Sequence, residues 1–188
     1  MILKEMLKLC KKSKRIRFIE TENDIFVSDE YVMANVTEIA QNWTAEDYAT
    51  ALDLTQDERD NYRIKNTKID ADLCNEITEE AERMRFSLNI DGEAVQPFIL
   101  ADGRVLFIQC KYHSIFKEEH PKEYRLGKFE DCVMLYIYVG SRMIGGICPL
   151  RIDGGCVKEF ARDLLIGAEK AEKEGFLQGY TQYSLIDD

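Results

Sequence analysis

The sequence lacks the patterns on which most metal, cofactor and phosphate sites are built. It contains two histidines, and its six cysteines form no Cys-x-x-Cys pair, so the usual spacing of a cysteine-rich zinc site is absent. It has neither a Gly-x-Gly-x-x-Gly stretch nor a glycine loop that ends in Gly-Lys-Ser/Thr, which excludes the common dinucleotide and triphosphate loops. The acids Asp57, Glu58 and Asp60 lack the glycine and the spacing of a calcium loop. The sequence therefore predicts no cofactor, no metal site and no catalytic residue.

Long apolar runs are missing as well. No stretch approaches the roughly 20 apolar residues of a membrane span. Lysines interrupt the first residues, MILKEMLKLCKKSKR, before the apolar core of a signal peptide could form. We therefore expect a cytoplasmic protein without membrane contact. The cysteines are predicted to stay free, because no export signal accompanies them.

Charge of one sign is unevenly distributed along the chain. The formal net charge is −10, which argues against a protein that coats nucleic acid with its whole surface. Residues 1–17, however, hold seven basic residues and one acid, whereas residues 44–83 hold twelve acids and five bases. One end of the chain is therefore basic, and one internal segment is acidic.

Residues 2–13 predict a helix with two different faces. Apolar residues recur at the three- and four-residue spacing of a stripe that packs on a core: Ile2, Leu3, Met6, Leu9 and Cys10. The opposite face gathers Lys4, Lys8, Lys11 and Lys12. Two interpretations are open for these lysines. They form a solvated face whose last members complement the helix dipole, or they form a face that contacts phosphates.

After this helix the pattern changes to strands and then to the acidic segment. Three strands are predicted from β-branched and aromatic residues: Arg15–Thr21, Ile25–Ser28 and Tyr31–Val36. Residues 44–84 are predicted to form a helical insertion with an acidic, solvated exterior. In it, Thr44 and Thr55 begin two short helices through capping boxes, and Asp70 begins a third that runs to Met84. The acidic exterior could also dock a basic partner.

Residues 85–151 contain the densest succession of predicted elements. Asp102-Gly103 is typical of a two-residue hairpin turn with both residues at positive φ, and Gly145-Gly146 indicates a β-bulge. The expected order is a strand over Arg85–Ile90, strands over Phe98–Ala101 and Arg104–Cys110, a helix over Lys111–Glu119, and strands over Glu123–Phe129, Cys132–Val139 and Arg142–Leu150. An amphipathic helix over residues 157–171 and a tail over residues 176–188 follow.

The two halves repeat an order of one helix and three strands, at residues 2–36 and 111–150, although they share few identical residues. An extra strand precedes the second helix, and the closing hairpin reads VMLYIYVGSRMIGGICPLRI. In these features the chain resembles the domain of the DNA sliding clamps over residues 1–36 and 85–151. The resemblance implies an α+β fold of two βαβββ-like units whose helices lie on the side that faces DNA.

The same resemblance implies a role for the basic helix. Its lysines, which are Lys4, Lys8, Lys11 and Lys12, would contact the DNA backbone without reading bases. Lys111 and Lys117 would be their counterparts on the second helix. The chain departs from the clamp pattern because it lacks the first strand of the first unit and carries the acidic insertion and the C-terminal helix. One such domain cannot close a ring, so a ring would need a homo-oligomer.

The end of the chain carries a second short resemblance. Gln182-Tyr183-Ser184-Leu185-Ile186 is similar to the peptide by which bacterial replication and repair proteins dock on the sliding clamp. The resemblance implies that Leu185 and Ile186 enter an apolar pocket and that Gln182 fixes the register through hydrogen bonds. A final strand would have the same pattern, so both interpretations stay open.

Cys110, His113 and His120 form the one arrangement with ligand or nucleophile character. Their C-x2-H-x6-H spacing would suit zinc if a fourth ligand lay nearby, and Cys110 with His113 could form a thiol nucleophile pair. No orienting Asn or Asp and no strained turn accompanies them. A buried thiol and a half-exposed imidazole are the simpler interpretation.

Together these patterns predict one α+β domain over residues 1–188. Its parts are a first αβββ unit (1–43), the acidic helical insertion (44–84), a second βαβββ unit (85–151) and the C-terminal helix and tail (152–188). The leading hypothesis is a non-catalytic, clamp-like accessory protein of DNA replication, of phage or mobile-element type. It would act through contacts with replication proteins and weak contacts with the DNA backbone. The alternative is a protein-interaction adaptor without DNA binding, which docks through the acidic insertion or the tail. An enzyme of unrecognised type comes third.

Overall fold

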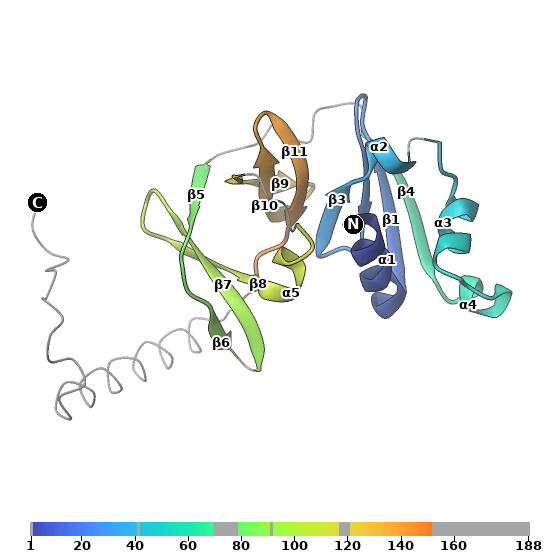
Figure 1. Ribbon diagram of the computed structural model, residues 1–188, viewed down its shortest axis with the longest axis horizontal. Coiled ribbons are helices and arrows are strands. Elements are labelled where there is room, and N and C mark those ends of the chain that lie inside the picture. Colours follow the sequence, from blue (N-terminus) through green and yellow to red (C-terminus); the bar gives the residue numbers. More distant parts are fainter. Residues whose placement is uncertain (1, 41, 70–78, 91, 117–120, 152–188) are drawn as a thin grey trace, which may run out of the picture. The chain divides into compact units, whose positions relative to one another are not determined.

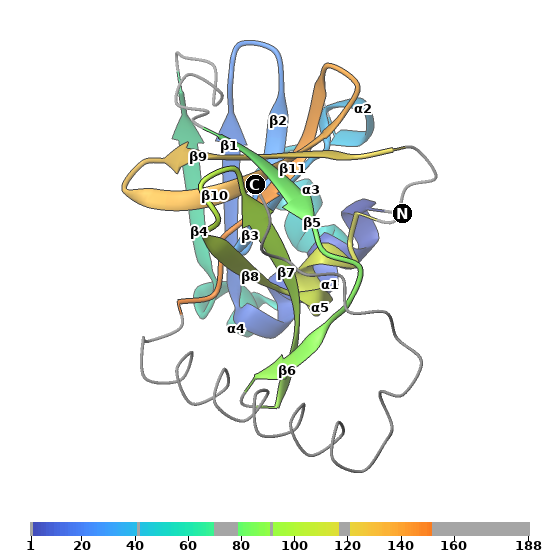
Figure 2. The ribbon, with the colours of Figure 1, turned by 90° about the vertical axis from the view of Figure 1, so that its left-hand side faces the viewer.

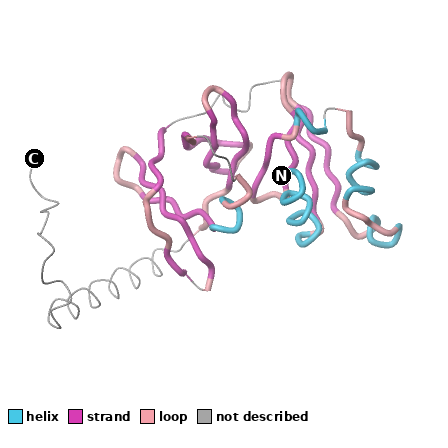
Figure 3. The backbone as a smooth tube through the Cα atoms, viewed as in Figure 1, coloured by secondary structure: helices cyan, strands magenta, loops and turns pink. Residues whose placement is uncertain are grey.

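The computed structural model describes residues 2–40, 42–69, 79–90, 92–116 and 121–151. The helices and strands of these residues belong to the unit that spans residues 1–150 (Figures 1 and 3). The helices are α1 (Ile2–Ser13), α2 (Thr37–Ala40), α3 (Ala45–Ala51), α4 (Gln56–Asp60) and α5 (Cys110–His113). The strands are β1 (Arg15–Glu20), β2 (Ile25–Ser28), β3 (Val32–Asn35), β4 (Arg63–Lys68), β5 (Glu79–Arg83), β6 (Leu88–Ile90), β7 (Glu93–Leu100), β8 (Val105–Gln109), β9 (Glu123–Phe129), β10 (Cys132–Val139) and β11 (Arg142–Ile147). The fold is mixed α and β, and strands predominate.

The strands join one sheet in the order β4-β1-β2-β3-β11-β10-β9-β5-β7-β6, with β8 paired to β7. Neighbouring strands are antiparallel except for β1 and β4, which are parallel. The two halves of the chain meet where β3 pairs with β11, at Ala34 opposite Gly145 and at Met33 opposite Gly146. This single pairing makes the sheet continuous from one half to the other.

Helix α1 packs on β1, β2 and β3 through the apolar stripe that the sequence predicts. Leu3, Met6 and Cys10 are its buried residues. Successive side chains of a strand point to opposite faces of the sheet, so alternate strand residues join α1 in one core. This first core cluster also contains Val27 and Ile137.

The opposite face of the sheet carries a second core cluster. Ile19, Phe26, Met33 and Tyr136 belong to it, and none of them is more than 1% exposed. Helix α1 covers the other face, so another part of the sheet must bury these side chains. Figure 2 shows β9 and β10 running across β1 and β2, which is the arrangement that encloses this cluster. The sheet is therefore curled and not flat.

Arg17 of β1 joins the two ends of this curl. Its guanidinium forms a bidentate ion pair with Glu130, in the turn between β9 and β10, and lies 5.1 Å from the centre of the Phe129 ring. It also donates a hydrogen bond to Thr67 of β4 (3.0 Å). The hydrogen bonds from Arg17 to Glu130 hold the pKa of Glu130 below its ordinary value. Arg17 thus connects strands that are five positions apart in the sheet.

Gly145 and Gly146 of β11 permit the close approach at the junction of the two halves. A Cβ atom on Gly145 would overlap the Met33 carbonyl oxygen and the Phe116 ring, and one on Gly146 would lie 2.7 Å from the Met134 sulfur. The pairing of β11 with β10 shifts register beside Gly145, so the predicted bulge at this pair is confirmed. Any side chain at Gly145 would have to push β11 away from β3.

The capping boxes of the acidic segment are confirmed, but its all-helical character is wrong. The side chains of Thr44 and Thr55 accept hydrogen bonds from the backbone N–H groups of Asp47 and Glu58, and helices α3 and α4 begin there. The segment also supplies β4, and Glu79–Arg83 of the expected third helix is β5. β5 pairs with β7 and β9, and these backbone hydrogen bonds override the helix preference of the sequence EEAER. The rest of that expected helix, residues 70–78, lies outside the described residues.

The hairpin between β7 and β8 is confirmed in place but has a different turn. Only Gly103 of the predicted pair has a positive φ, +84°. Hydrogen bonds from the Gly103 N–H to the Leu100 carbonyl and from the Leu100 N–H to the Arg104 carbonyl, both 2.9 Å, define a three-residue loop. Such a loop needs one left-handed residue after a simple turn, whereas the predicted two-residue turn needs two.

The remaining differences concern the lengths of elements. Helix α5 ends at His113 instead of Glu119, because Ile115 and Phe116 donate to the carbonyls three residues before them and the chain leaves the α-helix. Both side chains are buried in the first core cluster. The predicted strand over Arg85–Ile90 is shorter, as β6. Residues 117–120, the predicted helix over 157–171 and the tail lie outside the described residues, and the division of residues 1–188 into parts stays a prediction.

The contact at Gly145 leads to the first prediction. We expect Gly145→Ala to destabilise the protein by about 2–3 kcal/mol, because the added methyl group overpacks the β3–β11 junction. Ala94→Val, on the exposed part of β7, adds two methyl groups to a strand without such a neighbour and should stay within about 0.5 kcal/mol of the wild type. Urea unfolding followed by circular dichroism measures both. Equal stability of the two variants would show that the junction is not tightly packed.

Candidate functional site

The four lysines of the predicted DNA-binding face all lie on the solvent side of α1. Lys4, Lys8, Lys11 and Lys12 are exposed, opposite the buried stripe. Because each helical residue turns the chain by about 100°, the four side chains spread over an arc of about 100°. The structure therefore brings these sequence-predicted residues onto one face.

Two of these lysines are engaged by neighbours. The Lys8 ammonium lies 2.8 Å from Glu5 in an exposed ion pair, which contributes little to stability. The Lys11 ammonium donates a hydrogen bond to the Leu52 carbonyl (3.1 Å), at the C-cap of α3. This bond satisfies a carbonyl that the end of the helix leaves open. Within the described residues, Lys4 and Lys12 form neither an ion pair nor a hydrogen bond.

The acidic helices border the basic face. Glu58 of α4 has its pKa lowered, first by hydrogen bonds from Thr55 and then by the positive charges of Lys11 and Lys14. The same capping arrangement at Thr44 lowers the pKa of Asp47. Both carboxylates stay ionised at neutral pH, and the negative charge of Glu58 lies near Lys11 and Lys14.

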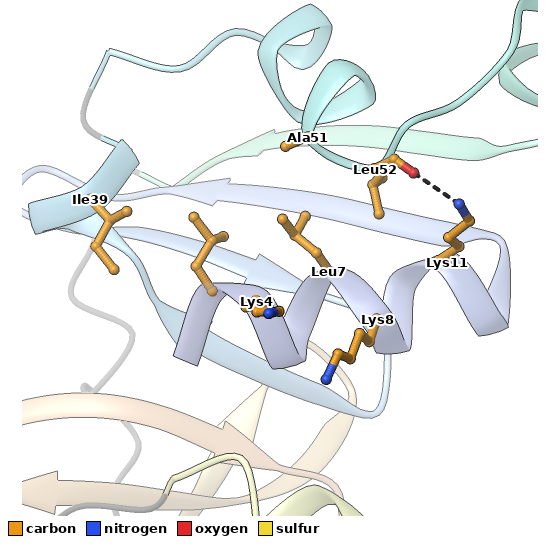
Figure 4. Close-up of a pocket in the computed structure, with 8 residues that line it drawn as sticks. Lys4, Leu7, Lys8, Lys11, Ile39, Ala51 and Leu52 are labelled. Carbon is orange, nitrogen blue, oxygen red and sulfur yellow. Dashed lines mark hydrogen bonds between the residues drawn. The ribbon is translucent and has the colours of Figure 1, made fainter. Parts of the chain in front are cut away.

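A groove of about 460 Å³ lies between α1, α2 and α3. Leu7 of α1, Ile39 of α2 and Leu52 after α3 face this common hollow in Figure 4. The full lining is Leu3, Leu7, Ile39, Ala51 and Leu52 with Lys4, Lys8 and Lys11. The Lys11 bond to Leu52 is drawn across one end of it (Figure 4). The groove thus has apolar walls with lysines along the α1 side.

This groove was not predicted from the sequence. Leu7 is the residue that could have indicated it, since it is apolar and lies on the flank of α1 between the buried stripe and the lysines. Ile39 is 51% exposed, and nothing in the sequence distinguishes it from a core residue. Nothing in the sequence indicates that the C-terminal end of α3 lies beside α1.

Of the other predicted site residues, the structure describes Lys111 but not Lys117 or the tail. Lys111 is paired with Glu93 (3.2 Å) and lies over the Tyr112 ring, whereas Lys117 is outside the described residues. The same is true of Gln182, Leu185 and Ile186, so the structure leaves the docking peptide untested. No helix in the described part of the chain is long and apolar enough to cross a membrane.

The described residues of the Cys–His arrangement, Cys110 and His113, have the contacts of structural residues. Cys110 is a free thiol, and the Nε2 atom of His113 lies 2.9 Å from the Tyr124 hydroxyl. His120 lies outside the described residues, and among the residues described no three Asp, Glu, His or Cys side chains gather as metal ligands would. Burial, helped by the charges of Arg83 and Lys122, lowers the pKa of His113 to about 4. At neutral pH His113 is therefore an uncharged hydrogen-bonding partner of Tyr124.

Comparison with protein-family models, curated proteins and solved structures finds no significant match for this chain.

The half-buried His113 imidazole leads to a prediction about acid stability. In the unfolded chain the pKa of His113 returns to about 6.5, so the unfolded state binds more protons between about pH 4 and 6.5. The stability that the uncharged His113 contributes is fully present above pH 6.5, and it is lost as the pH falls from about 6.5 towards 4. When the pH is lowered from 7.5 to 5.0, we expect the protonation of His113 alone to reduce the free energy of unfolding by about 1–2 kcal/mol.

Urea unfolding of the wild type and of His113→Gln at both pH values measures this contribution. Glutamine can still hydrogen-bond to Tyr124 but cannot be protonated, so the variant should lose less stability on acidification. Other titrating groups are present in both proteins and cancel. Identical pH dependence of the two proteins would contradict the shifted pKa.

Proposed function

We propose that this chain is a non-catalytic, clamp-like accessory protein of DNA replication, of phage or mobile-element type. It acts through contacts with replication proteins and through weak contacts between its basic helix and the DNA backbone. The observation that carries the proposal is the strand order β1-β2-β3-β11-β10-β9. Each half of this stretch is a run of three antiparallel strands preceded by a helix, and the two halves meet through their last strands.

This order supports a duplicated unit. α1-β1-β2-β3 and α5-β9-β10-β11 occupy corresponding places on either side of the β3–β11 pairing, as two units related by a twofold axis would. β8 directly precedes α5, so the second half has the element order βαβββ. α1 and α5 also contribute to the same core cluster through Met6 and through Ile115 just after α5. The flanking strands differ, since β4 is parallel to β1 and β5 is antiparallel to β9.

The basic face of α1 supports the DNA contact. Long lysine side chains need only present charge along phosphates, and such contacts place a protein on DNA without reading its sequence. The neighbouring carboxylates of α3 and α4 and the net charge of −10 oppose this attraction, so the binding is weak and sensitive to salt. Enclosing DNA would need several copies of the chain, and light scattering measures whether they assemble.

The DNA contact is tested by titrating a fluorescent DNA duplex of about 30 base pairs with the protein at several salt concentrations. With two to four phosphates contacted, the logarithm of affinity should fall with the logarithm of salt concentration at a slope of about −2 to −4. Replacing Lys4 and Lys12 by Glu should reduce the slope by about 2 and weaken binding at low salt.

The matched control replaces Lys65 and Lys128 by Glu. Both are exposed lysines away from α1, on β4 and β9. Their replacement changes the net charge by the same amount. If the two double variants lose affinity equally, the attraction is general and α1 is not the contact face. Undetectable binding of the wild type at low salt would refute the DNA contact altogether.

An adaptor without DNA binding is the second candidate. It is favoured by the exposure of the acidic side chains on α3 and α4, where the Glu46 side chain is 71% exposed although paired with Arg59. The adaptor would dock through this segment or through the C-terminal tail.

The tail has its own test. A pull-down with a bacterial sliding clamp should retain the full chain and lose the chain that lacks residues 180–188, because Leu185 and Ile186 would supply the apolar anchors. Leu185→Ala with Ile186→Ala in the full chain should lose retention in the same way. Equal retention of all three proteins would refute docking through the tail.

A further inference from the structure

The groove between α1, α2 and α3 exposes apolar surface in a way that folding alone does not require. Leu3 and Leu52 form a buried floor, 8% and 4% exposed, but Ile39 is 51% exposed and Leu7 is half-buried. These side chains come from three elements and converge on one hollow (Figure 4). Concave apolar surface with a few charged groups at its edge is the usual form of a binding site.

The charge of the groove is opposite to that of the protein. Lys4, Lys8 and Lys11 line it, and no Asp or Glu does, whereas the whole chain carries −10. The three lysines follow one side of α1 over about 10 Å, at a rise of about 1.5 Å per residue. An occupant that buries apolar groups here and carries acids along one edge would match both features.

The lining also indicates the kind of backbone that fits. The groove is walled by side chains of helices and by the residue after α3, and the Leu52 carbonyl already accepts a hydrogen bond from Lys11. It offers no strand edge to which an extended peptide could add. Helix-in-groove binding needs only side-chain anchors spaced by three and four residues. Duplex DNA would cover the lysines but would leave Leu7 and Ile39 against water, since its outer surface is polar and charged.

We propose that this groove binds an acidic amphipathic helix of a partner protein. Its apolar side chains enter between Leu7 and Ile39. Its Asp or Glu residues pair with Lys4 and with Lys8, which then gives up its exposed ion pair with Glu5. Lys11 keeps its bond to Leu52 and holds α3 at the distance from α1 that sets the width of the groove. This inference does not depend on DNA binding.

The probe is a fluorescein-labelled synthetic 16-residue helix with leucines at three- and four-residue spacing and glutamates at most other positions, a length of about four turns. Its twin carries lysine in place of each glutamate. Anisotropy titration should show binding of the acidic helix, and affinity for the basic twin at least about tenfold lower. High salt should weaken but not abolish the binding, because the apolar contacts remain.

Variants locate the site. Lys4→Glu with Lys8→Glu should weaken binding of the acidic helix about tenfold or more, and Ile39→Ser about fivefold through loss of an exposed apolar contact. Lys12→Glu changes charge on the same helix outside the groove lining and should change affinity by less than about twofold. Ile39→Ser should leave any DNA binding unchanged, which separates this site from the proposed DNA contact.

Three results would overturn the proposal: no binding of the acidic helix, equal binding of the two peptides, or affinity unchanged by Ile39→Ser and by Lys4→Glu with Lys8→Glu. Light scattering of the protein alone tests whether a second copy of this chain occupies the groove instead. If the protein self-associates and Ile39→Ser abolishes that association, the groove holds a second copy of this chain and the proposal is wrong.

Discussion

The close contact between β3 and β11 is the constraint on which the rest of the structure depends. It joins the two halves into one sheet, and it requires the absence of side chains at Gly145 and Gly146, where added atoms would meet the Met33 carbonyl and the Met134 side chain. The sheet that this pairing makes continuous buries a second core on the face that α1 does not cover. Arg17 then closes the curl through Glu130. Residues from both halves of the chain meet in each of the two cores.

Helix α1 connects this scaffold to the candidate site. Its buried stripe packs on β1, β2 and β3, so the direction of its lysine face follows from the packing of the first core. Lys11 adds a second constraint by binding the Leu52 carbonyl, which holds the end of α3 beside α1. The apolar groove results from this arrangement of α1, α2 and α3. Lys11, one of the four lysines for which phosphate contact was one of two open interpretations, is therefore also a structural residue.

The sequence predicted the elements whose signal is local. Helix α1, the strands β1 and β2, the run β9-β10-β11 and the capping boxes at Thr44 and Thr55 could be read from periodicity and from cap chemistry. β4 and β5 could not, because their residues are mostly polar and exposed and they are strands only through pairing with distant strands. The lysine face was predicted because helical spacing is local. The groove was not, because it combines α1 with Ile39 and Leu52, whose positions depend on tertiary packing.

The proximity of acidic and basic helices decides what size of ligand the α1 face accepts. At physiological salt, charges act over about 8–10 Å, so a ligand that covers the whole lysine face also meets the carboxylates of α3 and α4. Glu58 is near enough that the charges of Lys11 and Lys14 add to the Thr55 hydrogen bonds in lowering its pKa. A long polyanion would feel both signs and bind weakly. A short helix confined to the groove would pair with Lys4 and Lys8 and pack on the apolar walls while leaving α4 in solvent. A small acidic ligand therefore gains more from this surface than an extended one does.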